Sequence, residues 1–178
     1  MVCSNCFKMI YSQFIKCPEC GFIDQTLDIP ISSIDFSETH IRSGVELFGF
    51  SIEAEEDGYF CLPKGDGVPF YLRILSMNNA IEDTRNNPYG KTIKLFSVQD
   101  LNDQAINDPI AFYEAISISN LRNPWVSCAC NSDLETVLIY QMFHLGASLT
   151  MRDFIVSMEK FYVGMDLAFT VLEEYLAD

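Results

Sequence analysis

Four cysteines near the start of the chain have the spacing of metal ligands. They form two Cys-x-x-Cys pairs, Cys3 with Cys6 and Cys17 with Cys20, and ten residues separate the pairs. Two intervening residues allow both sulfur atoms of a pair to reach the same side of a tight turn, so two pairs can surround one ion. The spacing therefore predicts a tetrahedral site of four thiolates. Because four protein ligands leave no position for an activated water molecule, we expect a structural site and not a catalytic one.

Zinc is the metal that this ligand set favours, because all-thiolate sites in small N-terminal modules are most often structural zinc sites. Iron accepts the same four ligands and stays an alternative. The second pair has the sequence CPECG, in which Pro18 fixes φ and Gly21 can adopt a positive φ. This motif resembles the CPxCG knuckle of zinc ribbons and rubredoxin-like modules. The resemblance covers residues 1–23 and implies a small zinc ribbon, although Phe7 stands where the first knuckle of such modules often has glycine.

The other cysteines and the two histidines offer a second kind of chemistry. Cys61 and His144 have the residue types of a nucleophile and its base, and Cys128 with Cys130 could form a redox or metal-binding pair. All three cysteines, however, fall in segments with strand-like patterns, and free cysteine is among the most buried residue types. We therefore expect buried structural thiols, with His144 packed near the end of a helix and His40 exposed to solvent.

No other motif indicates an enzyme. Residues 64–67 have the composition of a hairpin turn and lack the following helix that a phosphate-binding loop needs. The acidic run at 53–57 lacks the alternating oxygen ligands of a calcium-binding loop, so we interpret it as a turn. These observations predict a protein without catalytic residues.

The chain is strongly acidic, with 25 Asp and Glu against 11 Lys and Arg and a formal net charge of −14. From Asp24 to Asp57 there are nine acidic residues and one basic residue, Arg42. Such a charge repels phosphate backbones and attracts basic proteins. The predicted ribbon has only Lys8 and Lys16, whereas nucleic-acid binding needs a clustered basic face. We therefore expect a basic protein partner and no direct nucleic-acid binding. The simpler interpretation is that the acidic surface keeps the protein soluble.

The sequence also indicates a compartment. No uncharged apolar segment reaches the roughly 18–20 residues of a membrane helix, so we expect no membrane contact. The N-terminus runs directly into the first cysteine pair, without the basic and apolar regions of a signal peptide. An odd total of seven cysteines with two metal-type pairs is typical of a reducing environment. We expect a cytoplasmic protein.

The elements that position these residues predict an α+β fold. The 178 residues suit a zinc ribbon at 1–23, an acidic linker at 24–43 and an α+β domain at 44–178. We expect two very short strands in the spacer at 7–16 and a short helix that starts at Ser37. In an antiparallel β-meander at 44–97, strands are expected at 47–52, 59–62, 68–76 and 91–97, with turns at 55–58, 64–67 and 86–90.

Helices are expected to cover this meander. The elements predicted at 98–178 are a helix from 108 to 121, a short strand at 125–130, a helix at 132–146 and a long C-terminal helix. The first helix starts with Asp as N-cap followed by Pro, and the second starts with a capping box of Ser132 and Glu135.

The C-terminal helix has the clearest periodicity in the chain. From Met151 to Leu176, apolar residues recur every three or four positions, and charged residues occupy the other side. A helix of about 25 residues would be near 38 Å long, which is more than a four-stranded sheet covers. We therefore expect most of the apolar stripe to pack on the sheet and part of it to dock a partner or a second copy of the chain.

These features favour a non-catalytic, zinc-binding cytoplasmic protein that binds a basic protein partner through its acidic surface. A concrete form, by analogy, is an immunity or antitoxin-type inhibitor, because such inhibitors are small, acidic and enzymatically silent. The alternative is an accessory zinc-ribbon subunit of a transcription or translation assembly, in which the ribbon contacts protein.

Overall fold

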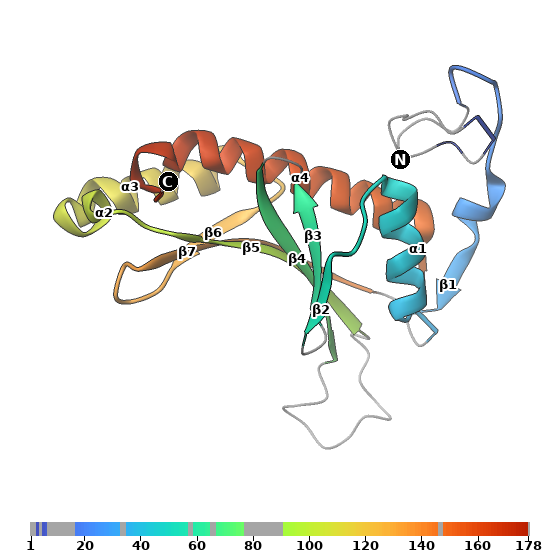
Figure 1. Cartoon of the computed structure of the whole chain (residues 1–178), viewed down its shortest axis with the longest axis horizontal. Coiled ribbons are helices and arrows are strands. Elements are labelled where there is room, and N and C mark those ends of the chain that lie inside the picture. Colours follow the sequence, from blue (N-terminus) through green and yellow to red (C-terminus); the bar gives the residue numbers. More distant parts are fainter. Residues whose placement is uncertain are drawn as a thin grey trace.

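The computed structural model describes residues 3, 5–6, 17–32, 35–56, 59–64, 67–76, 91–145 and 148–177. Helices cover one face of an antiparallel sheet (Figure 1), so the α+β class expected from the sequence is confirmed. The strands expected in the spacer 7–16 and the turn expected at 86–90 lie outside the described residues. Within the described ranges, no helix is both long and apolar enough to cross a bilayer.

The main sheet contains six strands of the described chain, in the spatial order β2-β3-β4-β5-β7-β6, and every neighbouring pair is antiparallel. The strands are β2 (Ala54–Glu56), β3 (Tyr59–Lys64), β4 (Gly67–Ser76), β5 (Lys91–Asp100), β6 (Ser127–Cys130) and β7 (Thr136–His144). The first four follow one another along the chain as spatial neighbours and form an antiparallel meander, although its first strand β2 occupies residues 55 and 56, where the start of a turn was expected. β7 and β6 then extend the sheet beyond β5.

A second, two-stranded sheet joins the segment before α1 (Glu38–Phe48) to the segment before the last long helix, α4 (Met151–Leu172). In it, β1 (Pro30–Ser32) pairs with β8 (Ser148–Thr150), directly after the short 3-10 helix η1 (Gln25–Asp28). Helix α1 (Glu38–Phe48) follows, with the expected N-cap Ser37. This helix begins inside the predicted linker and continues beyond residue 43, and the domain boundaries stay predictions.

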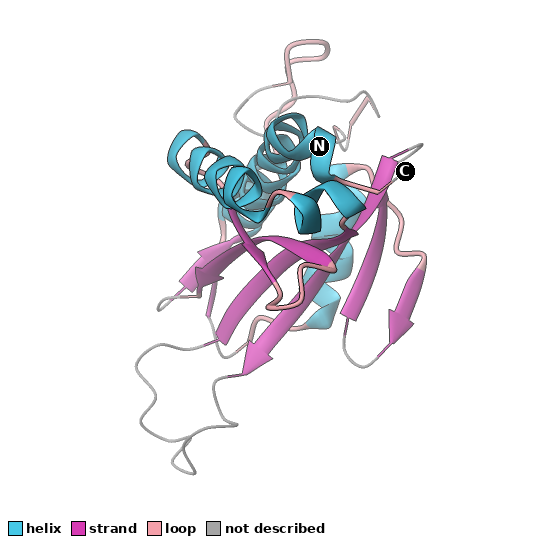
Figure 2. Cartoon of the chain, turned by 90° about the vertical axis from the view of Figure 1, so that its left-hand side faces the viewer, coloured by secondary structure: helices cyan, strands magenta, loops and turns pink. Residues whose placement is uncertain are grey.

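The helical layer consists of α2 (Asp103–Asn107), α3 (Pro109–Arg122) and α4 (Met151–Leu172), which continues into the 3-10 helix η4 (Glu173–Tyr175). Figure 2 shows helices gathered on one side of the main sheet. α3 begins as expected, because the Asp108 side chain accepts a hydrogen bond from the backbone N–H of Ala111 at 3.2 Å and proline follows it. The core between the layers contains large, fully buried side chains from helices, strands and the loop before α1: Phe36, Phe70, Phe112, Phe154, Phe161, Leu72, Ile93, Leu95 and Ile139.

The apolar stripe of α4 lies inside this core. Its buried members are Met151, Phe154, Ile155, Met158, Phe161, Gly164, Met165, Ala168 and Leu172. Helices α1 and α3 and strands β5 and β7 all pack against α4. On α4, the exposed large apolar side chains are Val163 and Leu167. Association of two copies through this helix stays a prediction, and it would have to use those two residues.

The helix expected at 132–146 is wrong. This segment contains strand β7, which lies between β5 and β6. The apparent capping box is a turn, in which the Asn131 side chain accepts a hydrogen bond from the backbone N–H of Glu135 at 2.9 Å. After the turn, Val137 and Ile139 are fully buried and their neighbours are partly exposed. Pairing with two neighbouring strands therefore overrides the local helix-start signal. The β-branched residues Val137 and Ile139, at alternate positions, also favour a strand.

The strand expected at 47–52 is also wrong, because α1 extends through Phe48. Gly49 ends the helix with a φ of 98°, in the left-handed region that glycine adopts without steric cost. Its N–H bonds to the carbonyl oxygens of Val45 and Glu46 at 3.1 and 3.0 Å. The first strand of the sheet, β2, therefore begins at Ala54, seven residues after the start of the expected strand.

Candidate metal centre

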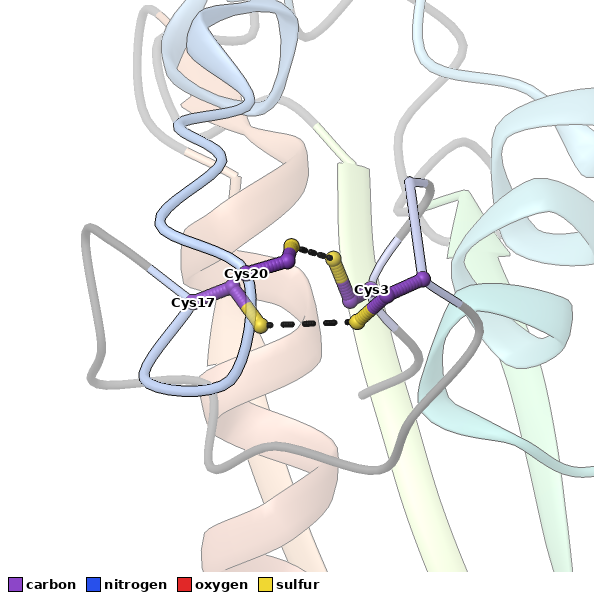
Figure 3. A group of neighbouring side chains, drawn as sticks. Cys3, Cys17 and Cys20 are labelled. Carbon is purple, nitrogen blue, oxygen red and sulfur yellow. Dashed lines mark hydrogen bonds between the residues drawn. The ribbon is translucent and has the colours of Figure 1, made fainter.

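The four N-terminal cysteines converge on one point, although they belong to two separate turns. Their Sγ atoms all lie within 4.8 Å of one another. The Sγ atoms of Cys3 and Cys20 are 3.7 Å apart, as are those of Cys6 and Cys17 (Figure 3). A sulfur tetrahedron around zinc, with bonds of about 2.3 Å, has edges of about 3.8 Å. The arrangement is therefore compatible with a metal ion held by four thiolates.

The backbone of the second pair has the form that its sequence predicts. Gly21 has a φ of 74°, in the left-handed region. Its N–H bonds to the carbonyl oxygen of Cys17 at 2.8 Å, and the N–H of Cys17 bonds to the carbonyl oxygen of Phe22 at the same distance. These two hydrogen bonds close the turn that directs the thiols of Cys17 and Cys20 toward the first pair.

The environment of the four sulfurs changes from buried to exposed across the site. Cys3 and Cys17 are only 4% and 3% exposed, whereas Cys20 lies at the surface. The Asn5 side-chain amide donates a hydrogen bond to Cys20 Sγ at 3.5 Å. This hydrogen bond, followed by one from the Phe22 backbone, lowers the pKa of Cys20 to about 6, so its thiolate form is present at neutral pH. Sequence analysis did not single out Asn5, although its place between Cys3 and Cys6 was the available signal.

The segment after the site is fixed to the body of the protein. Leu27 in η1 is buried in the main core. Arg152, at the start of α4, makes two hydrogen bonds to the Asp28 carboxylate, at 2.6 and 3.2 Å. These hydrogen bonds lower the pKa of Asp28. The metal site is therefore followed within eight residues by an anchor on the C-terminal helix.

The remaining cysteines do not assemble a nucleophilic site among the described residues. Cys128 is buried as expected, and its Sγ lies 3.4 Å from Ser119 Oγ. Cys61 and Cys130 are only partly buried, because each lies on a strand near an edge of the sheet. Burial raises the pKa of both Cys61 and Cys128, so these thiols are protonated at neutral pH and are weak nucleophiles.

The two histidines differ from expectation in their positions. His144 is the last residue of a strand and not the end of a helix, and its side chain lies outside the described residues. His40 is half-buried and not fully solvated: its ring stacks on Phe36 at 5.5 Å, and its Nδ1 accepts a hydrogen bond from the backbone N–H of Ser37 at 3.2 Å. His40 therefore stabilises the start of α1.

An open pocket of about 510 Å³ lies at the β6 edge of the main sheet. Its lining comprises Asn120, Asn123, Pro124, Trp125, Val126, Ser127, Tyr140, Gln141 and Met142. The side-chain amides of Asn120 and Asn123 already form structural hydrogen bonds, Asn120 with the backbone of Cys128 and Asn123 with the backbone of Gly164. Gln141 Oε1 is buried without a hydrogen-bond partner among the described residues. The pocket therefore offers hydrogen-bonding groups, and none of its lining residues is a histidine, cysteine or carboxylate.

Comparison with known proteins supports the fold. No protein family and no curated protein matches the sequence. The crystal structure of YbjN, a putative transcription regulator from E. coli, is similar with a TM-score of 0.57 and 17% identity, covering 80% of this chain and 97% of that chain. An uncharacterized protein from Methanothermobacter thermautotrophicus is similar with a TM-score of 0.51 and 10% identity, covering 79% and 99%. At these identities the likeness shows a shared α+β fold and does not extend to activity.

Proposed function

We propose that the chain binds one zinc ion through Cys3, Cys6, Cys17 and Cys20, and that it is a non-catalytic cytoplasmic protein. The observation that supports metal binding is the convergence of the four Sγ atoms, which all lie within 4.8 Å of one another. Thiolates are soft ligands that select zinc or iron over magnesium and calcium, and a closed four-thiolate set is the usual structural zinc site. Zinc binding contributes about 10–16 kcal/mol of apparent folding free energy in small zinc-finger peptides, so the ion would hold the two turns together.

The partner in this proposal is a basic protein that binds the acidic stretch 24–57. Among the described residues of that stretch, the exposed acidic side chains are Asp28, Asp35, Glu38, Glu46 and Glu53. Arg42, the one basic residue there, lies over the ring of Phe60 at 5.6 Å. A surface with this excess of negative charge accelerates association with a basic partner and makes the rate depend on salt.

A concrete form of this function is an immunity or antitoxin-type inhibitor. It is supported by the acidic charge and by the raised pKa values of Cys61 and Cys128, which argue against thiol nucleophiles. One observation favours a second function. The similar fold of YbjN, whose structure is titled that of a putative transcription regulator, supports an accessory zinc-ribbon subunit of a transcription or translation assembly.

Elemental analysis of the purified full-length chain tests the metal. We expect one zinc per chain, a strong loss in Cys17→Ser and Cys3→Ser, and no loss in Cys61→Ser, the matched control outside the cluster. Iron in place of zinc would change the identity of the metal but would still support a metal site at the four cysteines. A metal-free chain, or a Cys17→Ser variant with unchanged metal content, would show that the cluster is not a metal centre.

Affinity capture from the native host at low salt, with mass spectrometry, tests the partner. A single basic protein that salt releases supports the inhibitor, whereas a polymerase or ribosomal component supports the second function. Reversing Glu38 and Glu46 to lysine should abolish capture. Reversal of Glu173 and Glu174, which are exposed at the end of the last helix, is the matched control and should leave capture intact. If capture is unchanged by added salt and by the reversal of Glu38 and Glu46, the partner does not bind through the acidic surface.

A further inference from the structure

The face of the main sheet opposite the helices carries two adjacent rows of aromatic and cationic side chains. Strand pairing places Tyr59, Arg73 and Lys94 side by side in one row, and Tyr71, Phe96 and Tyr140 in the next. We call these six residues the cationic-aromatic face. All six are partly exposed, whereas Phe60 and Leu95, which alternate with them, are buried in the core. In the described part of the chain no helix lies over this face (Figures 1 and 2).

Contacts among the six side chains hold the two cations in place. The Arg73 guanidinium lies 4.4 Å from the ring centroid of Tyr59 and donates a hydrogen bond to the Tyr59 hydroxyl. Lys94 Nζ lies 5.0 Å from the ring centroid of Phe96 and 5.7 Å from that of Tyr140. Such cation–π contacts orient a charged group without neutralising it. Both positive charges are therefore fixed at the surface and keep their net charge.

The two cations are also direct neighbours on adjacent strands. Arg73 of β4 pairs in register with Lys94 of β5, and like charges that face each other across a sheet destabilise it. Among the described residues neither side chain forms an ion pair. An anion between the two groups would remove the repulsion and gain charge-assisted hydrogen bonds from both.

We propose that the cationic-aromatic face binds an acidic segment of a protein partner. Carboxylates of the segment bind between Arg73 and Lys94, and its apolar side chains pack on Tyr71, Phe96 and Tyr140. Tyrosine and arginine are the residue types that contribute most binding energy at protein interfaces. Its cations have the opposite charge to the exposed carboxylates of helix α1, Glu38 and Glu46, so they select a different partner or a different part of the same one.

Charge distinguishes this occupant from nucleic acid. Aromatic side chains on an open sheet also stack on unpaired bases. A nucleic-acid binder, however, neutralises several phosphates, and its affinity depends on a clustered basic surface. The cationic-aromatic face has only two cations, and the chain as a whole has a net charge of −14, which repels phosphate backbones. A short segment with one or two carboxylates needs no further positive charge.

Selection from a displayed library of random decapeptides, with the full-length chain as bait, tests the proposal. We expect enriched peptides that combine Asp or Glu with aromatic or large apolar residues. Fluorescence anisotropy with one enriched peptide should show about tenfold weaker binding for Arg73→Gln and for Lys94→Gln, as for the loss of a charge-assisted hydrogen bond. Lys94→Arg should retain binding. Arg122→Gln and Lys160→Gln, which remove exposed cations from the helical layer, are the matched controls and should bind like the wild type.

Each contrary outcome overturns the proposal. Enrichment of peptides without carboxylates would show that the ligand is not acidic. Unchanged peptide binding in Arg73→Gln and Lys94→Gln would show that the binding site lies elsewhere. A single-stranded oligonucleotide of ten thymidines that binds more tightly than the peptide, and loses binding in the same variants, would show that nucleic acid is the occupant. Concentration-dependent dimerisation that Arg73→Gln abolishes would show that the face binds a second copy of the chain.

Discussion

Asn5 Nδ2 lies 3.5 Å from Cys20 Sγ, so a residue between the first two candidate ligands donates a hydrogen bond to the last one. This contact links the two cysteine turns directly. Because Cys20 is the exposed ligand, it is the thiolate that water and competing protons reach most easily. Hydrogen bonds to metal ligands orient them and stabilise their charged form. Asn5 therefore protects the most accessible corner of the site.

Replacement of Asn5 by alanine should weaken metal binding. Loss of a hydrogen bond to a ligand typically costs about 10–100-fold in metal affinity. Competition of the purified protein with a chromophoric chelator measures that change. Asn5→Gln, which keeps an amide donor, should lose less affinity. Equal affinities of Asn5→Ala and wild type would mean that the contact does not support the ligand.

The ion pair between Asp28 and Arg152 should make stability depend on pH at acidic values. Hydrogen bonds from Arg152 lower the pKa of Asp28 in the folded state below its ordinary value of 3.8. The stabilisation is therefore complete above the unfolded-state pKa and disappears as the pH falls through the lower, folded-state value. Asp28→Asn should unfold at lower urea than the wild type near neutral pH. The difference should vanish at pH values below the folded-state pKa, where the Asp28 carboxyl group is protonated in both the folded and the unfolded state. A difference that persists there would assign the effect to something other than charge.

Gly44 is required by the close approach of α1 to α4. A Cβ atom at this position would lie 2.4 Å from two ring carbons of Phe154, a side chain that is fully buried and has no room to move. Gly44→Ala should therefore lower the free energy of unfolding by about 1–3 kcal/mol, the usual cost of overpacking. Ser43→Ala, on the exposed side of the same helix, should be neutral or slightly stabilising. Similar urea midpoints for the two variants would contradict the packing described for these helices.

The buried oxygen of Gln141 should be a stabilisation target. Because this oxygen has no hydrogen-bond partner in the part of the chain that the structure describes, Gln141→Met replaces an unsatisfied acceptor by an apolar atom of similar size. We expect a gain of about 1 kcal/mol in the free energy of unfolding. Gln99→Met is the control, because the Gln99 amide bonds to Ser97 Oγ at 3.3 Å and its removal should give no gain. A loss of stability in Gln141→Met would contradict the assignment of this oxygen as an unsatisfied acceptor.

The convergence of the four cysteines was the most predictable part of the molecule, because it depends on short spacings within two turns. Cys17 and Cys20 need only two intervening residues and a positive φ at Gly21, and both conditions can be seen in the sequence. The start of α3 was predictable for the same reason, since Asp108 and its following proline act within one turn. Residues that act across the chain, such as Asn5 on Cys20, required the structure.

Elements that depend on distant partners were harder to predict. β7 carries a local helix-start signal, yet its position between β5 and β6 decides its conformation. Six strands in place of four also explain how the sheet and its flanking helices bury the long α4. The pairing of Arg73 with Lys94 depends on the register of β4 and β5, which alternation within each strand does not determine. The sequence therefore predicted the fold class and the cluster of four cysteines, but not the open face of the sheet.

X-ray absorption spectroscopy at the zinc edge of the purified chain tests the central claim most directly. Ligation by the four cysteines predicts a single shell of four sulfur atoms at about 2.3 Å, and a mixed shell with fewer sulfurs in Cys17→Ser. A shell dominated by oxygen or nitrogen in the wild-type protein would contradict it, because Cys3, Cys6, Cys17 and Cys20 could then not be the ligands.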